Sequence, residues 1–364
     1  MLTDRCFQQD WIVRQSKALG ARDSQLVETC IYALELVGRM VEADLDFVFK
    51  GGTSLLLHIQ PMRRLSIDVD IATPVAMREL ERVLKQVCQT PFGEYVYQDW
   101  RDRENPPTRH FQIPYNSPTK GQDWPLQLDV LLGDVTYPKT VFKPIAMDFI
   151  EVEHEIKVKV PTIDCLLGDK LTAFAPETIG VLYDPPPRIP GGRKPEPKPI
   201  RVLKQLFDVG ELFMLADDLQ VVADAYERLF TVQNRARGGG FTREQALDDS
   251  LDTSYWISQL DLNKEEKNSK TIFLRSGIKA MDSHVLGQKF SVPTARIPAA
   301  RVALLAALIK NRRFDVILPN IRTVPSPQEI AGLTLNRRFE HLSKLRKTSL
   351  EAFYYWHLAD KYLS

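Results

Sequence analysis

The first long pattern in the chain is a repeat of apolar residues at helical spacing. Between residues 24 and 43, apolar positions recur every three or four residues, at Val27, Ile31, Leu34, Val37 and Val41. This period predicts an amphipathic helix. A short apolar run at residues 46–49 then predicts a strand, and the glycines at 51 and 52 predict a turn. We expect a short helix after this turn, capped by Thr53 or Ser54 and ending near His58.

Strand-like runs dominate the chain from there to about residue 160. A strand is predicted at residues 65–71, followed by a helix at 74–89 that begins with a proline. The remaining runs that predict strands lie at residues 94–100, 109–115, 126–132, 142–150 and 156–160. Helices and strands alternate only at the beginning of this region, which favours the α+β class with a mixed sheet.

The pattern after residue 160 is mainly helical. Helices are predicted at residues 162–175, with Thr162 as N-cap, and at 200–219, and helical spacing continues through most of the remainder. Residues 176–199 contain eight prolines and a Gly-Gly pair, which predict a long loop. We therefore expect two domains, a core at residues 20–160 and a mainly helical lobe at residues 161–364 that carries this Pro-rich loop.

The composition is that of an ordinary globular protein. Of 364 residues, 44% are hydrophobic and 26% are charged. No apolar run reaches the roughly 18 residues that span a bilayer, and the first residues, MLTDRCFQQDW, lack the basic and then apolar pattern of a signal peptide. The four cysteines are far apart and form neither a metal-ligand spacing nor a disulfide framework. These features predict a cytoplasmic protein with no membrane partner.

Basic residues gather in two segments, although the formal net charge is only +1. Residues 188–204 contain six Lys and Arg against one Glu, a local net charge of +5, and residues 337–347 contain five against one Glu, a local net charge of +4. Such segments contact phosphate groups or form a solvated surface, and the sequence leaves both interpretations open. The basic residues are Arg188, Arg193, Lys194, Lys198, Arg201 and Lys204 in the first segment and Arg337, Arg338, Lys344, Arg346 and Lys347 in the second.

The residues that indicate chemistry lie between positions 47 and 71. At Gly51 and Gly52 the absence of side chains lets the backbone turn sharply and approach a ligand closely. The free N–H groups at the start of the next helix, with the hydroxyls of Thr53 and Ser54, suit the phosphates of a nucleoside triphosphate. A Gly-Gly turn alone is a common feature, so it indicates a nucleotide site only in combination with the residues beside it.

Two aspartates follow at a spacing that completes the pattern. Asp68 and Asp70 are two residues apart on a predicted strand, so both carboxylates are expected on one face of that strand. The residues that alternate with them are apolar and predict that the opposite face is core: Ile67, Val69 and Ile71. Paired carboxylates suit Mg²⁺, which takes hard oxygen ligands and bridges them to phosphate, and such a site can hold two ions. The combination predicts a metal-dependent nucleotidyltransferase.

The stretch Lys50-Gly51-Gly52-Thr53-Ser54, followed by Arg64-x-Ser66-x-Asp68-x-Asp70, resembles the signature of the AbiEii/AbiGii nucleotidyltransferase toxins, within the polymerase-beta-like superfamily. The resemblance is specific over residues 47–71 and diffuse to about residue 215. It implies a polymerase-beta-like core that binds Mg²⁺ through both aspartates and nucleotide through Lys50, Gly51, Gly52, Thr53, Ser54 and Ser66. It also implies a toxin paired with an antitoxin, which transfers a nucleoside monophosphate from a nucleoside triphosphate to the 3′ end of tRNA and releases pyrophosphate.

Further residues are placed by the same resemblance. Asp129, on a predicted strand, is the candidate carboxylate that deprotonates the acceptor, and Asp134 is its rival. Lys170 matches a lysine that the family places beside the triphosphate, where it would neutralise phosphate charge. Asp208 lies in a stretch that resembles the family's Lys-Asp-x-x-Asp helix, with Gln205 where the family has its first Asp.

The remaining polar residues leave alternatives open. Arg63 and Arg64 are expected to hold the carboxylates, to touch the nucleotide or to lie on the surface. The six histidines form no ligand set, so we interpret them as structural or surface residues. The Pro-rich loop joins the helix of Lys170 to that of Asp208, so its basic residues are expected to hold the acceptor or to be solvated charges.

Two other functions fit the same residues. The acceptor of the nucleotide can instead be a small molecule, such as an aminoglycoside, or a protein hydroxyl. Alternatively the fold is catalytically silent and serves as an interaction module, although the intact pair Asp68 and Asp70 argues against this.

Overall fold

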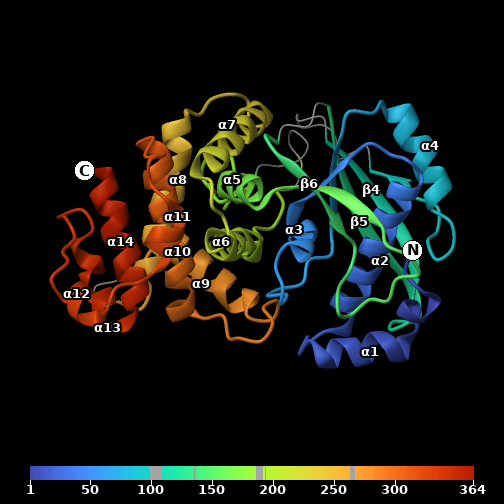
Figure 1. The fold of residues 1–364 in the computed structure, drawn as a ribbon, viewed down its shortest axis with the longest axis horizontal. Coiled ribbons are helices and arrows are strands. Elements are labelled where there is room, and N and C mark those ends of the chain that lie inside the picture. The colour runs from blue at the N-terminus through green and yellow to red at the C-terminus, as the bar shows by residue number, and fades with distance from the viewer. Residues whose placement is uncertain (99–107, 134–136, 186–191, 193, 263–266) are drawn as a thin grey trace. The chain divides into compact units, whose positions relative to one another are not determined.

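The computed structural model describes residues 1–98, 108–133, 137–185, 192, 194–262 and 267–364. The chain forms two compact units, which we call the sheet unit and the helical unit (Figure 1). The sheet unit consists of Met1–Thr162 and Ser283–Gln288, and the helical unit of Ile163–Asp282 and Lys289–Ser364. The division after Thr162 lies next to the predicted end of the core at residue 160, whereas no pattern in the sequence indicated that Ser283–Gln288 rejoins the first unit.

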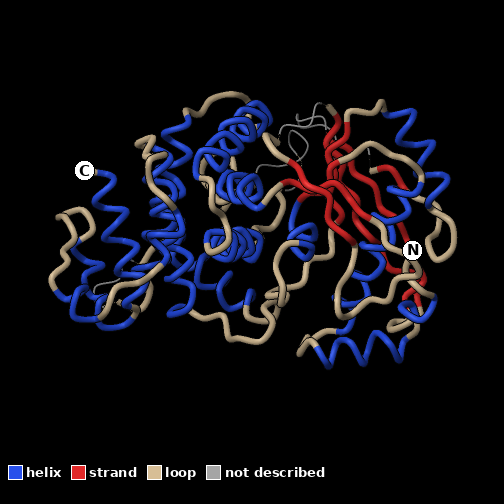
Figure 2. The backbone as a smooth tube through the Cα atoms, viewed as in Figure 1, coloured by secondary structure: helices blue, strands red, loops and turns tan. Residues whose placement is uncertain are grey.

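The sheet unit is built on a mixed five-stranded sheet with the order β1-β2-β5-β4-β3. Strands β2 and β5 are parallel, and the other neighbours are antiparallel. A separate two-stranded sheet pairs β6 with β7. The strands are β1 Val48–Lys50, β2 Val69–Thr73, β3 Val96–Tyr97, β4 Thr108–Ser117, β5 Gln122–Leu132, β6 Thr140–Pro144 and β7 Lys157–Pro161. The mixed sheet beside helices confirms the predicted α+β class (Figure 2).

Three of the predicted strands were shorter than predicted, and the one predicted at residues 94–100 is only Val96–Tyr97 among its described residues. The strand predicted at residues 65–71 begins only at Val69, and the strand predicted at 142–150 ends at Pro144. The apolar residues Ile145, Phe149 and Ile150 lie in a loop and are buried in the hydrophobic core, so they serve packing without strand pairing. Residues 99 and 100 of the strand predicted at 94–100 lie outside the described residues.

The three helices predicted in the sheet unit begin and end within a few residues of their predicted bounds, but the N-cap of α3 is Lys50 and not Thr53 or Ser54. The predicted helix at 24–43 is α2, whose N-cap Asp23 accepts a hydrogen bond from the backbone of Gln25 at 3.0 Å. No periodic pattern indicated α1, which is a short helix of low hydrophobicity. The helices are η1 Asp4–Phe7, α1 Gln9–Ala18, α2 Ser24–Glu42, α3 Gly51–Ser54, η2 Leu55–Leu57 and α4 Met77–Val87.

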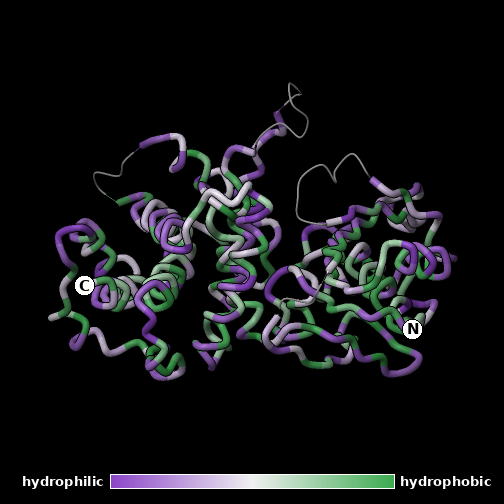
Figure 3. Tube along the Cα trace, turned by 90° about the horizontal axis from the view of Figure 1, so that it is seen from above, coloured by the Kyte–Doolittle hydropathy of each residue, from purple (hydrophilic) through white to green (hydrophobic). Residues whose placement is uncertain are grey.

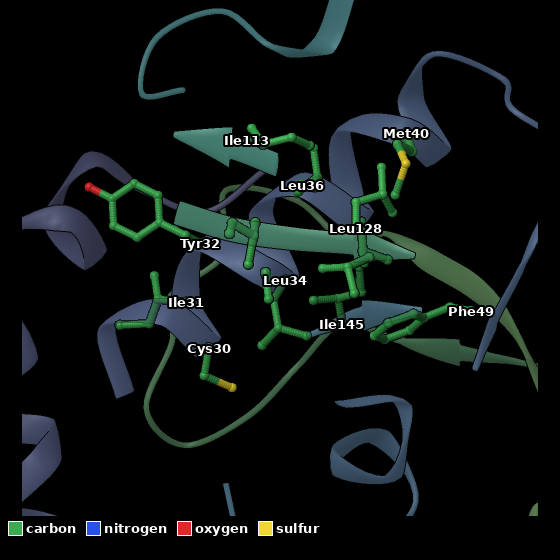
Figure 4. Packing of buried hydrophobic residues seen from close by; sticks show 14 of the residues in the cluster. Cys30, Ile31, Tyr32, Leu34, Leu36, Met40, Phe49, Ile113, Leu128 and Ile145 are labelled. Atoms are coloured by element: carbon green, nitrogen blue, oxygen red, sulfur yellow. The ribbon is translucent and has the colours of Figure 1, made fainter. Parts of the chain in front are cut away.

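Helix α2 packs against one face of the large sheet and closes the hydrophobic core. Figure 4 shows Leu36 and Met40 of α2 beside Leu128 of β5 and Ile113 of β4. Burial of each such side chain contributes roughly 1.5–3 kcal/mol to folding, so this face is fixed by hydrophobic packing. Because side chains alternate along a strand, the residues between these core positions point to the other face of the sheet. The candidate site residues of the strands lie on that other face.

A buried polar network ties α2 to the turn between β4 and β5. The Glu28 carboxylate is fully buried and accepts hydrogen bonds from the backbone N–H of Thr119 at 3.1 Å and from its hydroxyl. Gln25 donates to Glu28 at 2.9 Å and to the hydroxyl of Tyr115 at 3.0 Å. A buried carboxylate is tolerated only when it is hydrogen-bonded. The network therefore holds the β4–β5 hairpin, and with it the register of these two strands, against the helix.

The described part of the helical unit contains helices and no strand. Helix α10 is its central element and packs against α6, α8 and α14. Both hydrophobic and hydrophilic residues occur along the helices of this unit (Figure 3). The helices are α5 Ile163–Ala173, α6 Pro199–Phe213, α7 Leu219–Ala236, α8 Arg243–Gln259, α9 Ser269–Met281, α10 Val292–Lys310, α11 Leu318–Arg322, α12 Pro327–Ala331, η4 Glu340–Lys344, α13 Leu345–Thr348 and α14 Leu350–Leu363.

Helix α10 is apolar because it is the core of this unit. An 18-residue stretch of this 19-residue helix has a mean hydropathy of 1.5, so by length and composition the helix could cross a membrane. However, 67% of the apolar stretch is buried inside the protein. Its close contact with α6 depends on Gly210, where an added Cβ would lie 2.5 Å from the Cβ of Pro298. A core helix of a globular unit explains both the composition and this packing.

Candidate active site

Gly51 follows β1 directly as the first residue of α3 and lies against Asp70. Its φ of +73° favours glycine, and a Cβ added at this position would lie 2.0 Å from Oδ2 of Asp70. The close approach predicted for a ligand is therefore made, in this structure, by the Asp70 carboxylate of β2. Any side chain at position 51 would displace that carboxylate.

Gly52 makes room for two further side chains. A Cβ added here would lie 2.5 Å from Oγ of Ser66 and 2.9 Å from Nη2 of Arg64. Arg64 is buried, and its Nη1 donates to the carbonyl of Leu65 at 3.0 Å. Its backbone also pairs with Val285, in the segment that returns to the sheet unit. The two glycines thus gather Arg64, Ser66 and Asp70 around one turn.

The hydroxyls of Thr53 and Ser54 hold this turn in place. Both side chains are fully buried. Thr53 donates to the carbonyl of Asp68 at 2.6 Å, and Ser54 donates to the carbonyl of Gly51 at 3.0 Å. Their observed role is to fasten α3 to the start of β2 and to its own turn. A direct contact between either hydroxyl and a triphosphate stays a prediction.

Four polar residues line up across four neighbouring strands, and we call them the charged row: Lys50, Asp70, Asp129 and His110. Lys50 of β1 pairs with Asp70 of β2, Asp70 pairs with Asp129 of β5, and Asp129 pairs with His110 of β4. Paired residues of adjacent strands point to the same face, and the strands are about 4.8 Å apart. All four are partly exposed.

The residues beside the charged row show that it faces away from the core. Phe49, Ile71, Val130 and Phe111 each follow or precede a member of the row, and all four are fully buried. The row therefore lies on the opposite face of the sheet, as the alternation of Asp70 with Val69 and Ile71 predicted. Two carboxylates stand side by side at its centre, with a lysine and a histidine at the ends.

Asp68 is positioned differently from Asp70. It lies in the loop just before β2 and is exposed, so strand alternation fixes the direction of Asp70 only. The backbone of Asp68 is held by the hydrogen bond from Thr53. The prediction that both aspartates share one strand is corrected, because the regular strand begins one residue later.

The donor atoms at this turn suit a magnesium ion. Among the described residues, no group of three or more His, Cys, Asp or Glu side chains is gathered in metal-binding geometry. Mg²⁺ is usually held by only one or two carboxylates, with phosphates and water completing its octahedron. Asp68 and Asp70 are hard oxygen donors, and their side chains are exposed and partly exposed, respectively. The residues present therefore fit the predicted ion in number and chemistry.

His110 is a member of the site that the sequence did not reveal. Its Nδ1 donates to Oδ1 of Asp129 at 2.7 Å, and the two side chains are 15% and 29% exposed. We had interpreted all six histidines as structural or surface residues, and the structure places this one in contact with a predicted site residue. The only signal in the sequence was its place beside the apolar Phe111, and the pairing of β4 with β5 is a non-local property.

Lys170 and Asp208, which were predicted separately, contact each other in the helical unit. Nζ of Lys170 lies 3.2 Å from Oδ2 of Asp208, and the side chains are 8% and 2% exposed. Lys170 is in α5 and Asp208 in α6. Gln205, the position at which the sequence departs from the family pattern, lies one turn before Asp208 in α6, and its side-chain nitrogen donates to the carbonyl of Arg201 at 3.4 Å.

The basic segments are only partly described. Asp134, Arg188 and Arg193 lie outside the described residues. In the Pro-rich loop, Lys194 pairs with Asp184, while Lys198 is exposed at the N-cap of α6. In the second segment, Arg338 pairs with Asp252 at 3.2 Å, and Arg346 donates to the carbonyl of Leu333. Some of these basic residues are thus already paired with groups of the protein itself.

A cavity of about 650 Å³ in the sheet unit lies away from these residues. It is lined by residues of η1, α2 and the end of α4, such as Phe7, Arg39 and Val87. None of the predicted site residues lines it.

Three solved structures are distantly similar to the chain. A candidate nucleotidyltransferase from H. pylori is 16% identical, with a TM-score of 0.41 over 80% of this chain and 97% of that one. JHP933 from Helicobacter pylori is 13% identical, with a TM-score of 0.39 over 86% and 95% of the two chains. An antigenic nucleotidyltransferase-like protein from Paracoccidioides brasiliensis is 16% identical, with a TM-score of 0.33 over 58% and 91%.

A search of the curated proteins finds no match to this chain. The assignment rests on a family match that covers residues 36–306, which includes the Gly-Gly turn, the charged row, Lys170 and Asp208. That family is described as the nucleotidyl transferase AbiEii toxin of type IV toxin–antitoxin systems, and the chain belongs to it.

Proposed function

We propose that this nucleotidyltransferase moves a nucleoside monophosphate from a nucleoside triphosphate to the 3′ end of an RNA, with tRNA as the acceptor class, in a Mg²⁺-dependent reaction. We further propose that it acts in the cytoplasm as the toxin of a pair whose antitoxin counteracts it. One observation carries the catalytic part. Asp70 and Asp129 are paired in register on adjacent parallel strands, and the Asp70 carboxylate lies directly against Gly51 of the Gly-Gly turn.

Each of these residues has a separate role in the proposed reaction. Asp68 and Asp70 hold Mg²⁺, which supplies positive charge to the triphosphate when it is bound. Asp129 takes the proton of the acceptor hydroxyl, and the hydroxyl oxygen forms a bond to the α-phosphorus. The bond between the α-phosphorus and the bridging oxygen breaks, and pyrophosphate leaves with that electron pair. Because the attack is direct, the protein supplies positioning and charge, and no covalent enzyme intermediate is required.

Cations complete the nucleotide site in this proposal. Lys50 neighbours Asp70 in the charged row and Arg64 lies over Gly52, so both are close to the turn that receives the phosphates. Ser66 lies against the same glycine. Lys170 is assigned to the triphosphate by the family pattern, and it must leave or share its contact with Asp208 to act there.

RNA is proposed as the acceptor because of the positive charge of the Pro-rich loop. The basic residues of the Pro-rich loop, among them Lys194 and Lys198, suit a polyanionic acceptor better than a small molecule or a protein hydroxyl. Changing Arg188, Arg193, Lys194 and Lys198 to Ser is expected to weaken RNA binding and flatten its salt dependence, with nucleotide affinity unchanged. A fall in nucleotide binding without a fall in RNA binding would contradict this assignment.

The deciding experiment supplies purified protein with Mg²⁺, total tRNA and each α-labelled nucleoside triphosphate in turn. Labelled tRNA lengthened at its 3′ end is expected with at least one nucleotide, and chelation of the metal should stop the reaction. Asp70→Asn serves as the matched inactive variant, since it keeps the shape of the side chain and removes its charge. Label found in a small molecule or a protein instead of RNA would overturn the acceptor, and equal transfer by Asp70→Asn would overturn the site.

A further inference from the structure

We infer that His110 is a positioning residue for the reaction: it holds the Asp129 carboxylate in the orientation from which it accepts the proton of the acceptor hydroxyl. The inference rests on the proposed function, because it assumes that Asp129 is the base. It starts from the contact between Nδ1 of His110 and Oδ1 of Asp129, at 2.7 Å. A carboxylate only accepts hydrogen bonds, so Nδ1 carries the hydrogen.

Both partners are fixed by the sheet. They are directly paired residues of β4 and β5, and each is flanked by fully buried core residues, Phe111 beside His110 and Val130 beside Asp129. The same hairpin is held at its turn by the buried contacts between Glu28 and Thr119. The imidazole therefore approaches the carboxylate from a rigid strand, which is the arrangement that preorganises a catalytic group.

The position of Asp129 explains why it needs such a partner. Its neighbour on the other side is Asp70, so two carboxylates stand on adjacent strands about 4.8 Å apart. Mutual repulsion would turn the Asp129 side chain away from the row. A hydrogen bond at Oδ1 opposes this rotation and stabilises the carboxylate charge. A carboxylate has about four lone-pair sites, so a bond at one oxygen leaves it able to take a proton.

The chain contains a second pair of the same kind that serves as a control. Nε2 of His154 lies 2.7 Å from Oε1 of Glu42, and these side chains are 55% and 39% exposed. This pair is outside the charged row. Removal of His154 therefore deletes an equally short histidine–carboxylate contact without touching the proposed base.

The test measures kcat and KM for labelled nucleotide with tRNA as acceptor, together with the melting temperature. His110→Ala is expected to lower kcat about 10- to 100-fold, as loss of a supporting hydrogen bond does, and to leave KM for nucleotide almost unchanged. His110→Asn should restore most of kcat, because its Nδ2 is bonded to Cγ as Nδ1 is in histidine. His110→Gln, whose nitrogen is one bond farther out, should not, and His154→Ala should behave as wild type.

A double variant shows whether His110 acts through Asp129. Asp129→Asn and the combination of Asp129→Asn with His110→Ala are expected to be equally slow, since the second change removes support from a base that is already absent. Additive losses, wild-type kcat in His110→Ala, or failure of a well-folded His110→Asn to restore activity would overturn the inference while the proposed function stands. Absence of transfer by the wild-type protein would overturn the proposed function and this inference together.

Discussion

The charged row of the sheet unit and the Lys170–Asp208 pair of the helical unit place similar residues in opposite environments. The row stands on a sheet surface, where its members are partly exposed and like charges are neighbours. The Lys170–Asp208 pair is sealed between α5 and α6, with side chains 8% and 2% exposed. The charged row is thus partly open to solvent, whereas the Lys170–Asp208 pair is shielded from it.

This difference in burial predicts whether a substitution affects stability or activity. A buried charge that loses its partner destabilises the fold strongly, whereas a partly exposed one is rehydrated at little cost. Substitutions in the charged row should therefore affect transfer more than stability, and substitutions of the sealed pair should affect stability first. The following predictions test this division.

The largest effect is expected from Lys170→Met, which leaves the Asp208 carboxylate buried without its lysine. The unfolding free energy of the helical unit should fall by about 3–5 kcal/mol, measured by denaturant titration. The control is Lys310→Met, whose partner Asp248 is 39% exposed and whose loss should cost about 0–1 kcal/mol.

Combining Lys170→Met with Asp208→Asn sharpens the comparison, because it also removes the buried carboxylate charge. Stability should recover in large part. If Lys170 also binds triphosphate, transfer should remain at least about tenfold below wild type, equivalent to about 1.4 kcal/mol. Full recovery of transfer together with stability would show that the lysine is only structural.

A smaller effect, confined to activity, is expected from Gly51→Ala. The added Cβ would meet Oδ2 of Asp70 at 2.0 Å, so the carboxylate must move. A displacement of that size should lower kcat about 100-fold. Gly121→Ala controls for backbone strain, since Gly121 has a similar φ of +67° with no atom near its Cβ position. If both variants lose transfer equally, backbone strain rather than the position of Asp70 is responsible.

The smallest effect, at most about 1.4 kcal/mol for each pH unit, concerns a buried carboxylate of the helical unit that has no part in the proposed chemistry. Oδ2 of Asp249 accepts hydrogen bonds from the backbone N–H of Glu177 and the hydroxyl of Thr178, each at 2.8 Å. Burial raises the pKa of Asp249 to about 7 from its ordinary value of 3.8. The folded protein therefore binds this proton more tightly than the unfolded chain, and the resulting stability is fully present below about pH 4 and is lost as the pH rises to about 7.

Hydrogen exchange of α8 at pH 5, 6 and 7 measures this dependence. Within the window, each pH unit should change the stability of wild type by up to about 1.4 kcal/mol more than that of Asp249→Asn, which has no proton to bind. Transfer should be the same in both proteins. Parallel pH profiles of the two would show that Asp249 does not titrate in this range.

Much of the fold followed from local patterns. The spacing of Ile31 and Leu34 is sufficient for α2, since a helix of that length needs only one apolar face and a good cap. The sequence patterns were less informative for apolar residues that are buried outside helices and strands. Ile145 and Phe149 were predicted to lie in a strand, because a buried loop and a buried strand have similar composition. Only the packing of the folded chain distinguishes the two.

The resemblance stated from residues 47–71 is confirmed by the family match over residues 36–306. The site itself was predictable in part. Gly51 and Asp70 were recognised as belonging together, and the structure places them in direct contact. The partners of Asp129 were not predictable, because nothing near residue 129 in the sequence specifies that it lies between Asp70 and His110.

The sequence by itself determined which side of β2 faces the core, because that choice depends on the side chains of one segment and the period of its backbone. It placed Asp70 opposite Val69 and Ile71 for this reason. Only the tertiary structure decided which segments become neighbours: Asp129 beside Asp70, His110 beside Asp129, and Lys170 against Asp208. Strand register and helix contacts minimise the free energy of the whole core, to which segments far apart in the chain contribute together, so no local pattern encodes them.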